Sequence, residues 1–190
     1  MTVLYRSLLI VCVLGMHPAT MPAQARGDKL VFIVRHAEKA NATDPDPSLS
    51  EAGKARAAAL AVALRDARVT DILVTSRKRT QETAAVVVDA RQLIAHVVPL
   101  SANTAEHISA VAAAIRKAAG NAVLVVGHSN TVTGIIAALG APRLPDLCDA
   151  QYANLFIVRL PVRGNPSLIR AQYGTPDPAD AGTCAAASMK

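Results

Sequence analysis

Apolar runs rich in β-branched residues alternate with alanine-rich segments along this chain, and this alternation limits the possible folds more than any other feature. Strands that are apolar throughout and separated by helices form a parallel sheet with both faces covered. The pattern therefore predicts an α/β fold, with a three-layer, doubly wound, mostly parallel sheet and helices on both faces. We expect strands at 30–34, 71–75, 94–100 and 122–127, helices near 50–66, 80–92, 104–119 and 131–139, and a hairpin or edge pair at 154–160 and 167–173.

The N-terminus has the features of a secretory signal peptide. Arg6 precedes an apolar stretch at 7–16, and Ala23-Gln24-Ala25 offers a small-x-small cleavage site. The apolar stretch is shorter than the roughly twenty residues that span a bilayer, although a retained membrane anchor is the alternative. We expect cleavage after Ala25, a periplasmic or secreted protein, and no stable membrane insertion. The predicted organisation is a signal peptide at 1–25, one domain at 26–174 and a loosely ordered tail at 175–190.

The charge of the chain favours anionic partners. It has 20 basic and 14 acidic residues, a net charge of +6 at pH 7, and a basic surface attracts anions. Nucleic acid is not expected to be a partner, because the chain has no tryptophan, only three tyrosines and two phenylalanines. Aromatic platforms for stacked bases are therefore scarce, and small anions remain.

Two cysteines, Cys148 and Cys184, remain after removal of the leader. In an oxidising compartment they form one disulfide or stay as two free thiols, and the sequence leaves both states open. Neither belongs to a pair with metal-ligand spacing. We expect no metal and no other cofactor.

Basic and imidazole side chains follow three of the predicted strands. Arg35 and His36 end the strand at 30–34, Arg77 and Arg79 follow the strand at 71–75, and His128 follows the strand at 122–127. In open α/β sheets, ligands bind beyond the carboxyl ends of the strands. These side chains are therefore expected to meet in one site.

Such a site suits the chemistry of phosphoryl groups. Two arginines bind a dianion through bidentate hydrogen bonds, and the guanidinium fork matches phosphate geometry. A neutral imidazole beside them can attack phosphorus, giving a phosphohistidine that water hydrolyses. A second imidazole can stabilise charge on the phosphoryl oxygens in the transition state. The residue types thus indicate phosphoryl transfer to histidine and then to water.

Four segments in chain order resemble motifs of the histidine phosphatase superfamily, the phosphoglycerate mutase-like group. "VRHAEK" resembles its Arg-His-Gly motif, with Ala37 in the place of the glycine. "LSEAGKARA" is similar to its Leu-Ser/Thr-x-x-Gly-x-x-x-Ala segment, and "TSRKRTQETA" to its Ser/Thr-x-x-x-Arg-x-x-x-Thr-Ala element. "VLVVGHSN" resembles its Gly-His-Ser/Gly segment. The resemblance covers Val31 to about Leu139 and points to a small exported phosphatase branch.

The resemblance implies a role for each matching residue. His36 is the nucleophile, Arg35 and Arg79 bind the phosphate, and His128 completes the pocket. Arg77 competes with Arg79 for its place, but Arg79 stands four residues before the Thr-Ala pair, as in the family's motif.

The general acid is expected between the arginine helix and the second histidine, where Glu106 is the candidate and Glu38 the fallback. Glu106 also suits a helix's first turn, where a carboxylate is favoured by the helix dipole. His96 and His107 have no motif context and are expected to be structural or exposed.

The implied function is metal-independent hydrolysis of phosphomonoesters. The chain lacks the long insertions of the superfamily's mutases, which favours a phosphatase. Its substrate would be a small phosphorylated molecule, a phosphorylated envelope glycan or a protein, and 41–47 is expected to border the entrance. The alternative is a non-catalytic phosphate-binding or phosphoprotein-binding module on the same fold. The oligomeric state is open.

Overall fold

A six-stranded sheet forms the centre of the computed structural model, which describes residues 27–41 and 43–181. The strands are β1 (Lys29–Arg35), β2 (Asp71–Val74), β3 (Ala95–Val97), β4 (Ala122–Gly127), β5 (Asn154–Leu160) and β6 (Ser167–Gln172), and the helices are α1 (Glu51–Ala63), α2 (Lys78–Arg91), α3 (Thr104–Lys117) and α4 (Val132–Ala138). The sheet order is β3-β2-β4-β1-β5-β6. Strands β1 to β4 are parallel, and β5 and β6 add an antiparallel edge.

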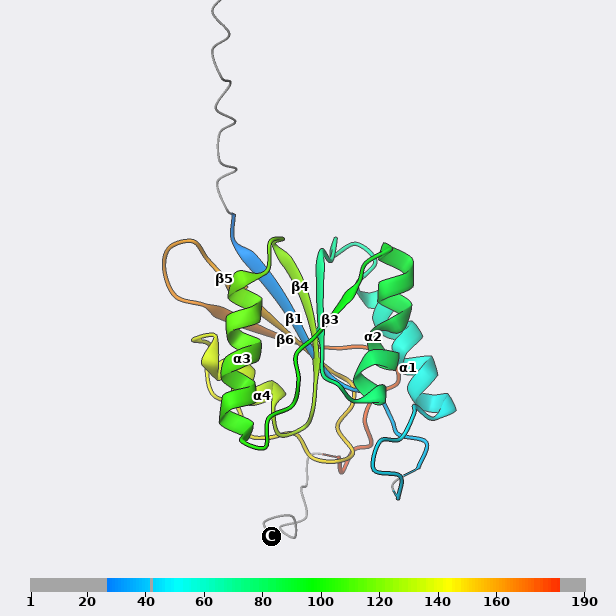
Figure 1. Cartoon of the computed structure of the whole chain (residues 1–190). Helices are drawn as coiled ribbons and strands as arrows, with labels where there is room; N and C mark the ends of the chain where they lie inside the picture. The colour runs from blue at the N-terminus through cyan, green and yellow to red at the C-terminus, as the bar shows by residue number, and fades with distance from the viewer. Residues whose placement is uncertain (1–26, 42, 182–190) are drawn as a thin grey trace, which may run out of the picture.

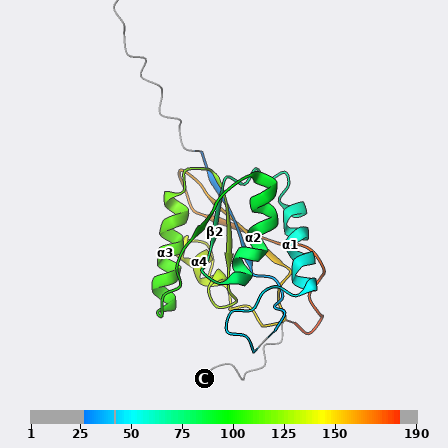
Figure 2. The same ribbon diagram turned by 45° about the vertical axis from the view of Figure 1, so that its right-hand side comes forward.

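Helices cover both faces of the sheet, as Figures 1 and 2 show from two directions. Successive side chains of a strand point to opposite faces. Val31 and Ile33 of β1 therefore join the core beneath α3 and α4, whereas Phe32 and Val34 join the core beneath α1 and α2. The predicted three-layer α/β architecture is confirmed.

The two central strands are buried along their length. Every residue of β4 is buried, and so are the last five residues of β1. Val and Ile suit this position because their branched side chains pack well on a pleated surface. By contrast, the edge strand β3 is only three residues long, shorter than the run at 94–100 had indicated, and two of its residues are exposed. The short edge strand offers little unpaired backbone to other chains.

The turn before α1 holds the loop that follows β1. The Ser50 hydroxyl caps α1 by accepting a hydrogen bond from the Gly53 amide at 3.1 Å, and the Ser50 amide donates to the Glu38 carbonyl at 2.9 Å. A Cβ on Gly53 would lie 2.3 Å from that carbonyl oxygen. Only glycine fits there. The "LSEAG" segment therefore positions the backbone just after His36.

Residues 175–181 contact the domain. One carboxylate oxygen of Asp177 accepts hydrogen bonds from the Tyr152 and Ala153 amides, both at 2.8 Å, and Ala181 is buried. Cys148 is disulfide-bonded, and its partner lies outside the described residues. The predicted leader and Cys184 also lie outside them.

Candidate active site

The carboxyl ends of β1 and β4 bring two histidines together. Arg35 pairs with Gly127 in the parallel register, and the His36 amide donates to the Gly127 carbonyl at 3.0 Å. The next residue after each strand is a histidine, His36 and His128. Their ring centroids are 5.4 Å apart, and the planes meet at 62°. The register of two buried strands therefore fixes the pair.

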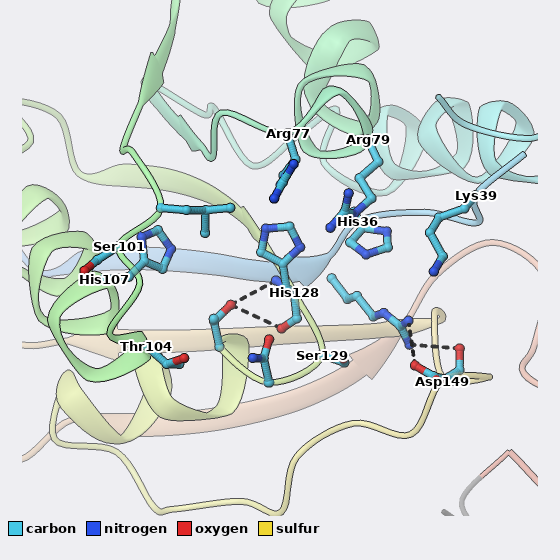
Figure 3. A pocket seen from close by; sticks show the side chains of 14 residues that line it. His36, Lys39, Arg77, Arg79, Ser101, Thr104, His107, His128, Ser129 and Asp149 are labelled. Atoms are coloured by element: carbon cyan, nitrogen blue, oxygen red, sulfur yellow. Dashed lines mark hydrogen bonds and ion pairs between the residues drawn. The ribbon is translucent and has the colours of Figure 1, made fainter. Parts of the chain in front are cut away.

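A cavity of about 380 Å³ opens over this pair (Figure 3). Four of the predicted site residues line it: Arg35, His36, Arg79 and His128. The rest of the wall consists of residues to which the sequence assigned no role in the reaction: Lys39, Arg77, Leu100, Ser101, Thr104, His107, Ser129, Asn130, Thr131 and Asp149.

His36 is neutral and oriented. Its Nδ1 lies 2.8 Å from the carbonyl oxygen of Ala37. Because a carbonyl only accepts, Nδ1 carries the proton and Nε2 keeps its lone pair. The pKa of His36 is lowered to about 3, above all by burial and also by Arg35, His128 and Arg79, against the opposing effect of the Ala37 carbonyl. The ring is therefore a free base at neutral pH, which is the form that a nucleophile needs.

His128 has a similar environment. Its Nε2 lies 3.1 Å from the Thr75 hydroxyl, and its amide donates to the Thr131 hydroxyl at 2.9 Å. Burial lowers the pKa of His128 to about 3, with further contributions from Arg79, His107 and Arg77. Both imidazoles are thus uncharged in the free protein, because burial and the arginines disfavour a further positive charge.

Arg35 is anchored to the loop before β5. One Nη atom donates to the carbonyls of Cys148 at 2.8 Å, Asp149 at 3.0 Å and Gln151 at 3.3 Å. The guanidinium also lies 4.2 Å from the ring centre of Tyr152, with the other Nη atom 3.4 Å from the Tyr152 hydroxyl. Its Nε is buried and has no hydrogen-bond partner among the described residues. Burial lowers the pKa of Arg35.

Arg79 reaches the cavity from the first turn of α2. Its Nη1 lies 3.6 Å from Asp46, whose carboxylate also accepts from the Lys78 amide. Its buried Nε likewise has no partner in the described part of the chain. The pKa of Arg79 is lowered by burial first and then by the neighbouring Arg77.

The helix that carries Arg79 also supports the nucleophile. The Thr83 hydroxyl donates to the Arg79 carbonyl and accepts from the Ala37 amide at 2.9 Å. This contact gives a physical role to the Thr-Ala pair of the motif, since Thr83 links α2 to the backbone beside His36.

The structure places the two candidate acids outside the cavity lining. Glu106 is exposed in the first turn of α3, where its carboxylate accepts from the Ser101 hydroxyl at 2.8 Å and lies 3.4 Å from the Asn103 amide nitrogen. Ser101 itself lines the cavity. Glu38 forms an ion pair with the buried Arg56 at 2.8 Å, which links the loop after His36 to α1.

Sequence reasoning missed His107 and Asp149 in the cavity wall, and Tyr152 beside it. His107 is buried and lines the cavity, with Nδ1 3.0 Å from the Pro99 carbonyl. Asp149 and Tyr152 lie on the loop that Arg35 holds. None of these residues follows a predicted strand directly or belongs to a motif, so only the tertiary structure reveals them.

No group of three or more histidine, cysteine, aspartate or glutamate side chains within 27–41 and 43–181 is placed to hold a metal ion. None of the described helices is long and apolar enough to cross a membrane.

Comparison with known proteins agrees with this geometry. Residues 31–103 match the family model described as histidine phosphatase superfamily (branch 1), a stretch that contains Arg35, His36 and Arg79. This part of the chain is similar to the histidine phosphatase superfamily. No curated protein matches the sequence.

Solved structures of phosphatases share the fold. The protein histidine phosphatase SixA, complexed with tungstate, is 21% identical, with a TM-score of 0.59 over 75% of this chain and 96% of its own. A mycobacterial glucosyl-3-phosphoglycerate phosphatase is 14% identical, with a TM-score of 0.57 over 78% of this chain and 100% of its own. At these identities the likeness concerns the fold, while the family match supports a phosphatase.

Proposed function

We propose that this protein hydrolyses phosphomonoesters through a phosphohistidine formed on His36. The observation that carries the proposal is the environment of His36: its Nδ1–H is held by the Ala37 carbonyl, so that Nε2 keeps a lone pair in a cavity lined by three arginines. A fixed tautomer and a depressed pKa are what activate a histidine nucleophile at neutral pH.

The reaction has two steps. In the first, Nε2 of His36 forms a bond to phosphorus while the ester P–O bond breaks, and the leaving oxygen takes the electron pair and a proton. In the second, water attacks phosphorus and gives a proton to the group that protonated the leaving oxygen, the P–N bond breaks with its electron pair returning to Nε2, and inorganic phosphate leaves with His36 restored. Arg35 and Arg79 would bind the phosphoryl oxygens throughout. Their unpartnered Nε donors support this role, because a buried donor without an acceptor is costly.

His128 would stabilise the phosphoryl oxygens opposite His36. Its ring lies 5.4 Å from that of His36, centre to centre. As a negatively charged phosphoryl group enters, the charge favours protonation of a neighbouring imidazole. His128 would then offer a charged donor to the transition state, when such a donor is worth most.

Protonation of the leaving group is assigned to Glu106. The carboxylate accepts a hydrogen bond from Ser101, which lines the cavity. When Glu106 is protonated, this hydrogen bond can reverse, and the Ser101 proton can pass to the leaving oxygen. Glu38 is less suited, since its carboxylate is paired with Arg56.

Phosphoenzyme trapping tests the mechanism. Rapid quenching of the wild-type protein with a ³²P-labelled phosphomonoester should yield an acid-labile, base-stable phosphoryl group on the peptide that contains His36. The His36→Ala protein is the control and should yield none. Steady turnover with no phosphoenzyme at any time point would contradict a histidine nucleophile. A wild-type protein that binds phosphate but is inert across a diverse ester panel would instead favour the non-catalytic phosphate-binding module.

We further propose that the activity needs no metal. The groups assigned to attack, binding and charge stabilisation are all side chains, so hydrolysis of 4-nitrophenyl phosphate should persist in excess EDTA. Loss of activity in EDTA and recovery with zinc or magnesium would contradict the phosphohistidine mechanism.

Export is a proposal that rests on the sequence alone. Cleavage after Ala25 would leave Arg26 as the first residue of a periplasmic or secreted protein, where small phosphorylated molecules or phosphorylated envelope glycans are the expected substrates. N-terminal sequencing of the protein from the exported fraction tests this, and an intact leader there would overturn it.

A further inference from the structure

The charges that line the cavity are not balanced. Four of the lining side chains are cationic, and Asp149 is the one carboxylate among the described lining residues. Arg35 and Arg79 each have a carboxylate within 4 Å, at 3.5 Å from Asp149 and at 3.6 Å from Asp46. Neither Lys39 nor Arg77 has one among the residues that the structure describes. A single phosphoryl group held by Arg35 and Arg79 would therefore leave Lys39 and Arg77 without an anionic group in direct contact.

Arg77 is the more confined of these two cations. Its side chain is half-buried, whereas Lys39 is exposed. Its one side-chain hydrogen bond within the described residues is a contact of 3.5 Å to the Pro45 carbonyl, at the outer limit for such a bond. A guanidinium has five N–H donors, so most of those of Arg77 are unused by the protein.

The position of Arg77 is on the His128 side of the cavity. In Figure 3 its guanidinium points toward His128, while Lys39 lies beyond His36 toward Asp149. Arg77 is also one of the charges that lower the pKa of His128 and of Arg79, as its proximity requires. Arg77 is thus close to the reacting groups, but it lies beside His128 rather than beside the nucleophile His36.

The space beside Arg77 is large enough for more than a phosphoryl group. A cavity of about 380 Å³ is within the range of sites for small molecules. Its lining includes the hydroxyls of Ser101 and Thr104 and the side-chain amide of Asn130. These are polar groups suited to the leaving part of a substrate, and Arg77 adds an unpaired cation to the same region.

We propose that Arg77 is a specificity-determining residue, which binds a second anionic group, a carboxylate or a second phosphate, on the leaving part of a small phosphorylated substrate. This inference rests on the proposed function, because it takes the phosphoryl group to lie against His36. Two charged hydrogen bonds from one guanidinium fix the orientation of the bound anionic group as well as attracting it. Substrates with a neutral leaving part would leave Arg77 unpaired and would be bound less well.

Three compounds with the same three-carbon spacing test the inference. Propyl phosphate has no second charge, 3-phosphonooxypropanoate adds a carboxylate, and propane-1,3-diyl bisphosphate adds a phosphate. Calorimetric dissociation constants are measured on the His36→Ala protein, which keeps Arg77 and does not consume the compounds. At least one doubly charged compound should bind roughly ten- to a hundredfold more tightly than propyl phosphate, and which of the two does so identifies the second group.

Substitution of Arg77 in the same background should remove that preference. Arg77→Gln should bring the doubly charged compound to within about threefold of propyl phosphate, and Arg77→Lys should restore part of the difference, since lysine keeps the charge but not the fork. Thermal unfolding and circular dichroism check that the variants fold. The absence of any preference in the His36→Ala parent, or its survival in Arg77→Gln, overturns the inference.

Lys39→Gln is the matched control for charge. It removes one positive charge from the same cavity, on the other side of His36. It should weaken all three compounds by similar factors and keep their ratio, whereas an equal loss of the preference in Lys39→Gln would mean general attraction and would overturn a specific role for Arg77.

The failure of this inference is distinguishable from that of the proposed function. Binding ratios need no turnover, whereas the absence of a phosphoenzyme on the wild-type protein concerns His36 alone. An active enzyme without the Arg77 preference would lose only the present inference.

Discussion

The two walls of the cavity are built differently. The inner wall consists of Arg35, His36 and His128, at the ends of the central strands, and these residues are 3%, 4% and 7% exposed. The outer wall comes from loops and helix starts, and includes Arg77, which is half-buried, and Asp149, whose side chain is 96% exposed. The sheet therefore fixes the nucleophile, the second histidine and one of the two phosphate-binding arginines, while Arg77, the residue assigned to substrate choice, lies outside the sheet. Loops on a rigid scaffold commonly divide the work in this way.

The difference in burial between the two walls affects both the ionisation of their side chains and their tolerance of substitution. Burial of the inner wall lowers the pKa of His36 and of His128 to about 3, which keeps both rings neutral. The outer wall has few fixed contacts, so its side chains are more easily changed without loss of the fold. Substitutions of the inner wall should affect turnover most, and substitutions of the outer wall should change the preference among substrates.

The largest effect is expected from the nucleophile. His36→Ala should lower kcat for 4-nitrophenyl phosphate at least about a thousandfold, because a member of a catalytic unit is rarely replaceable. Affinity for inorganic phosphate, measured by calorimetry, should change much less, since the arginines remain. Arg79→Ala is the contrasting variant and should weaken phosphate binding and turnover together, by roughly tenfold or more. Near wild-type turnover in His36→Ala would show that His36 is not the nucleophile and that the inner wall does not carry the reaction.

A smaller effect, and one that depends on the substrate, is expected from Glu106. A general acid is typically worth about a hundredfold or more when the leaving group needs a proton. Glu106→Gln should therefore slow hydrolysis of alkyl phosphates by about that factor and leave 4-nitrophenyl phosphate nearly unchanged, because nitrophenolate leaves without a proton.

Two controls locate the acid. Ser101→Ala should reproduce the pattern if the proton passes through that hydroxyl, which lies 2.8 Å from the Glu106 carboxylate. Asp149→Asn changes the carboxylate that does line the cavity and should not reproduce it. Equal losses on alkyl and aryl esters in Glu106→Gln would assign the role to another group.

The strand-borne part of this site was predictable from the sequence. The β-branched runs at 30–34 and 122–127 mark central strands because few other positions tolerate apolar residues on both faces, and residues after such strands meet at one edge. That argument placed Arg35, His36 and His128 together, and the structure brings them together. The predicted helix starts are also close, with α3 beginning at Thr104 as expected.

The part of the site on the loop before β5 was not predictable. Tyr152 and Asp149 lie more than a hundred residues from Arg35 in sequence, and no periodicity reports such a contact. The ion pair between Glu38 and Arg56 was also hidden, because Arg56 appears in a run of alanines that reads as an ordinary helix surface. Long-range polar contacts depend on packing that local patterns do not encode.

The two neutral histidines predict how stability depends on pH. The folded pKa of each is about 3, while in the unfolded chain it is about 6.5. Between these values the unfolded state binds more protons, so the free energy of unfolding rises with pH. Lowering the pH from 7 to 4 should therefore reduce it by an amount on the order of a few kcal/mol, seen in urea unfolding curves.

Substitution of one inner-wall histidine should flatten this dependence. His128→Asn removes one group that must be protonated on unfolding, so its stability should fall less between pH 7 and pH 4. His96→Gln is the control, because His96 is exposed on the edge strand β3, and its curve should follow the wild type. A wild-type stability that does not change over this range would contradict the low pKa values of the pair.

The smallest effect is expected where the two walls join, at Tyr152. Its ring centre lies 4.2 Å from the Arg35 guanidinium carbon and 6.2 Å from the centre of the His36 ring, while its hydroxyl is 3.4 Å from Arg35 Nη2. Tyr152→Phe keeps the ring and loses only a long hydrogen bond, so phosphate affinity should fall by no more than about threefold. Tyr152→Leu also loses the cation–π contact, so phosphate affinity should fall by about tenfold.

The loop itself should stay in place in both variants, because Asp177 accepts hydrogen bonds from the backbone amides of Tyr152 and Ala153. Phosphate binding and thermal unfolding, measured together, separate positioning of Arg35 from loss of the fold. A Tyr152→Leu protein with unchanged phosphate affinity would show that Arg35 keeps its position without the Tyr152 ring, through its contacts with the loop carbonyls.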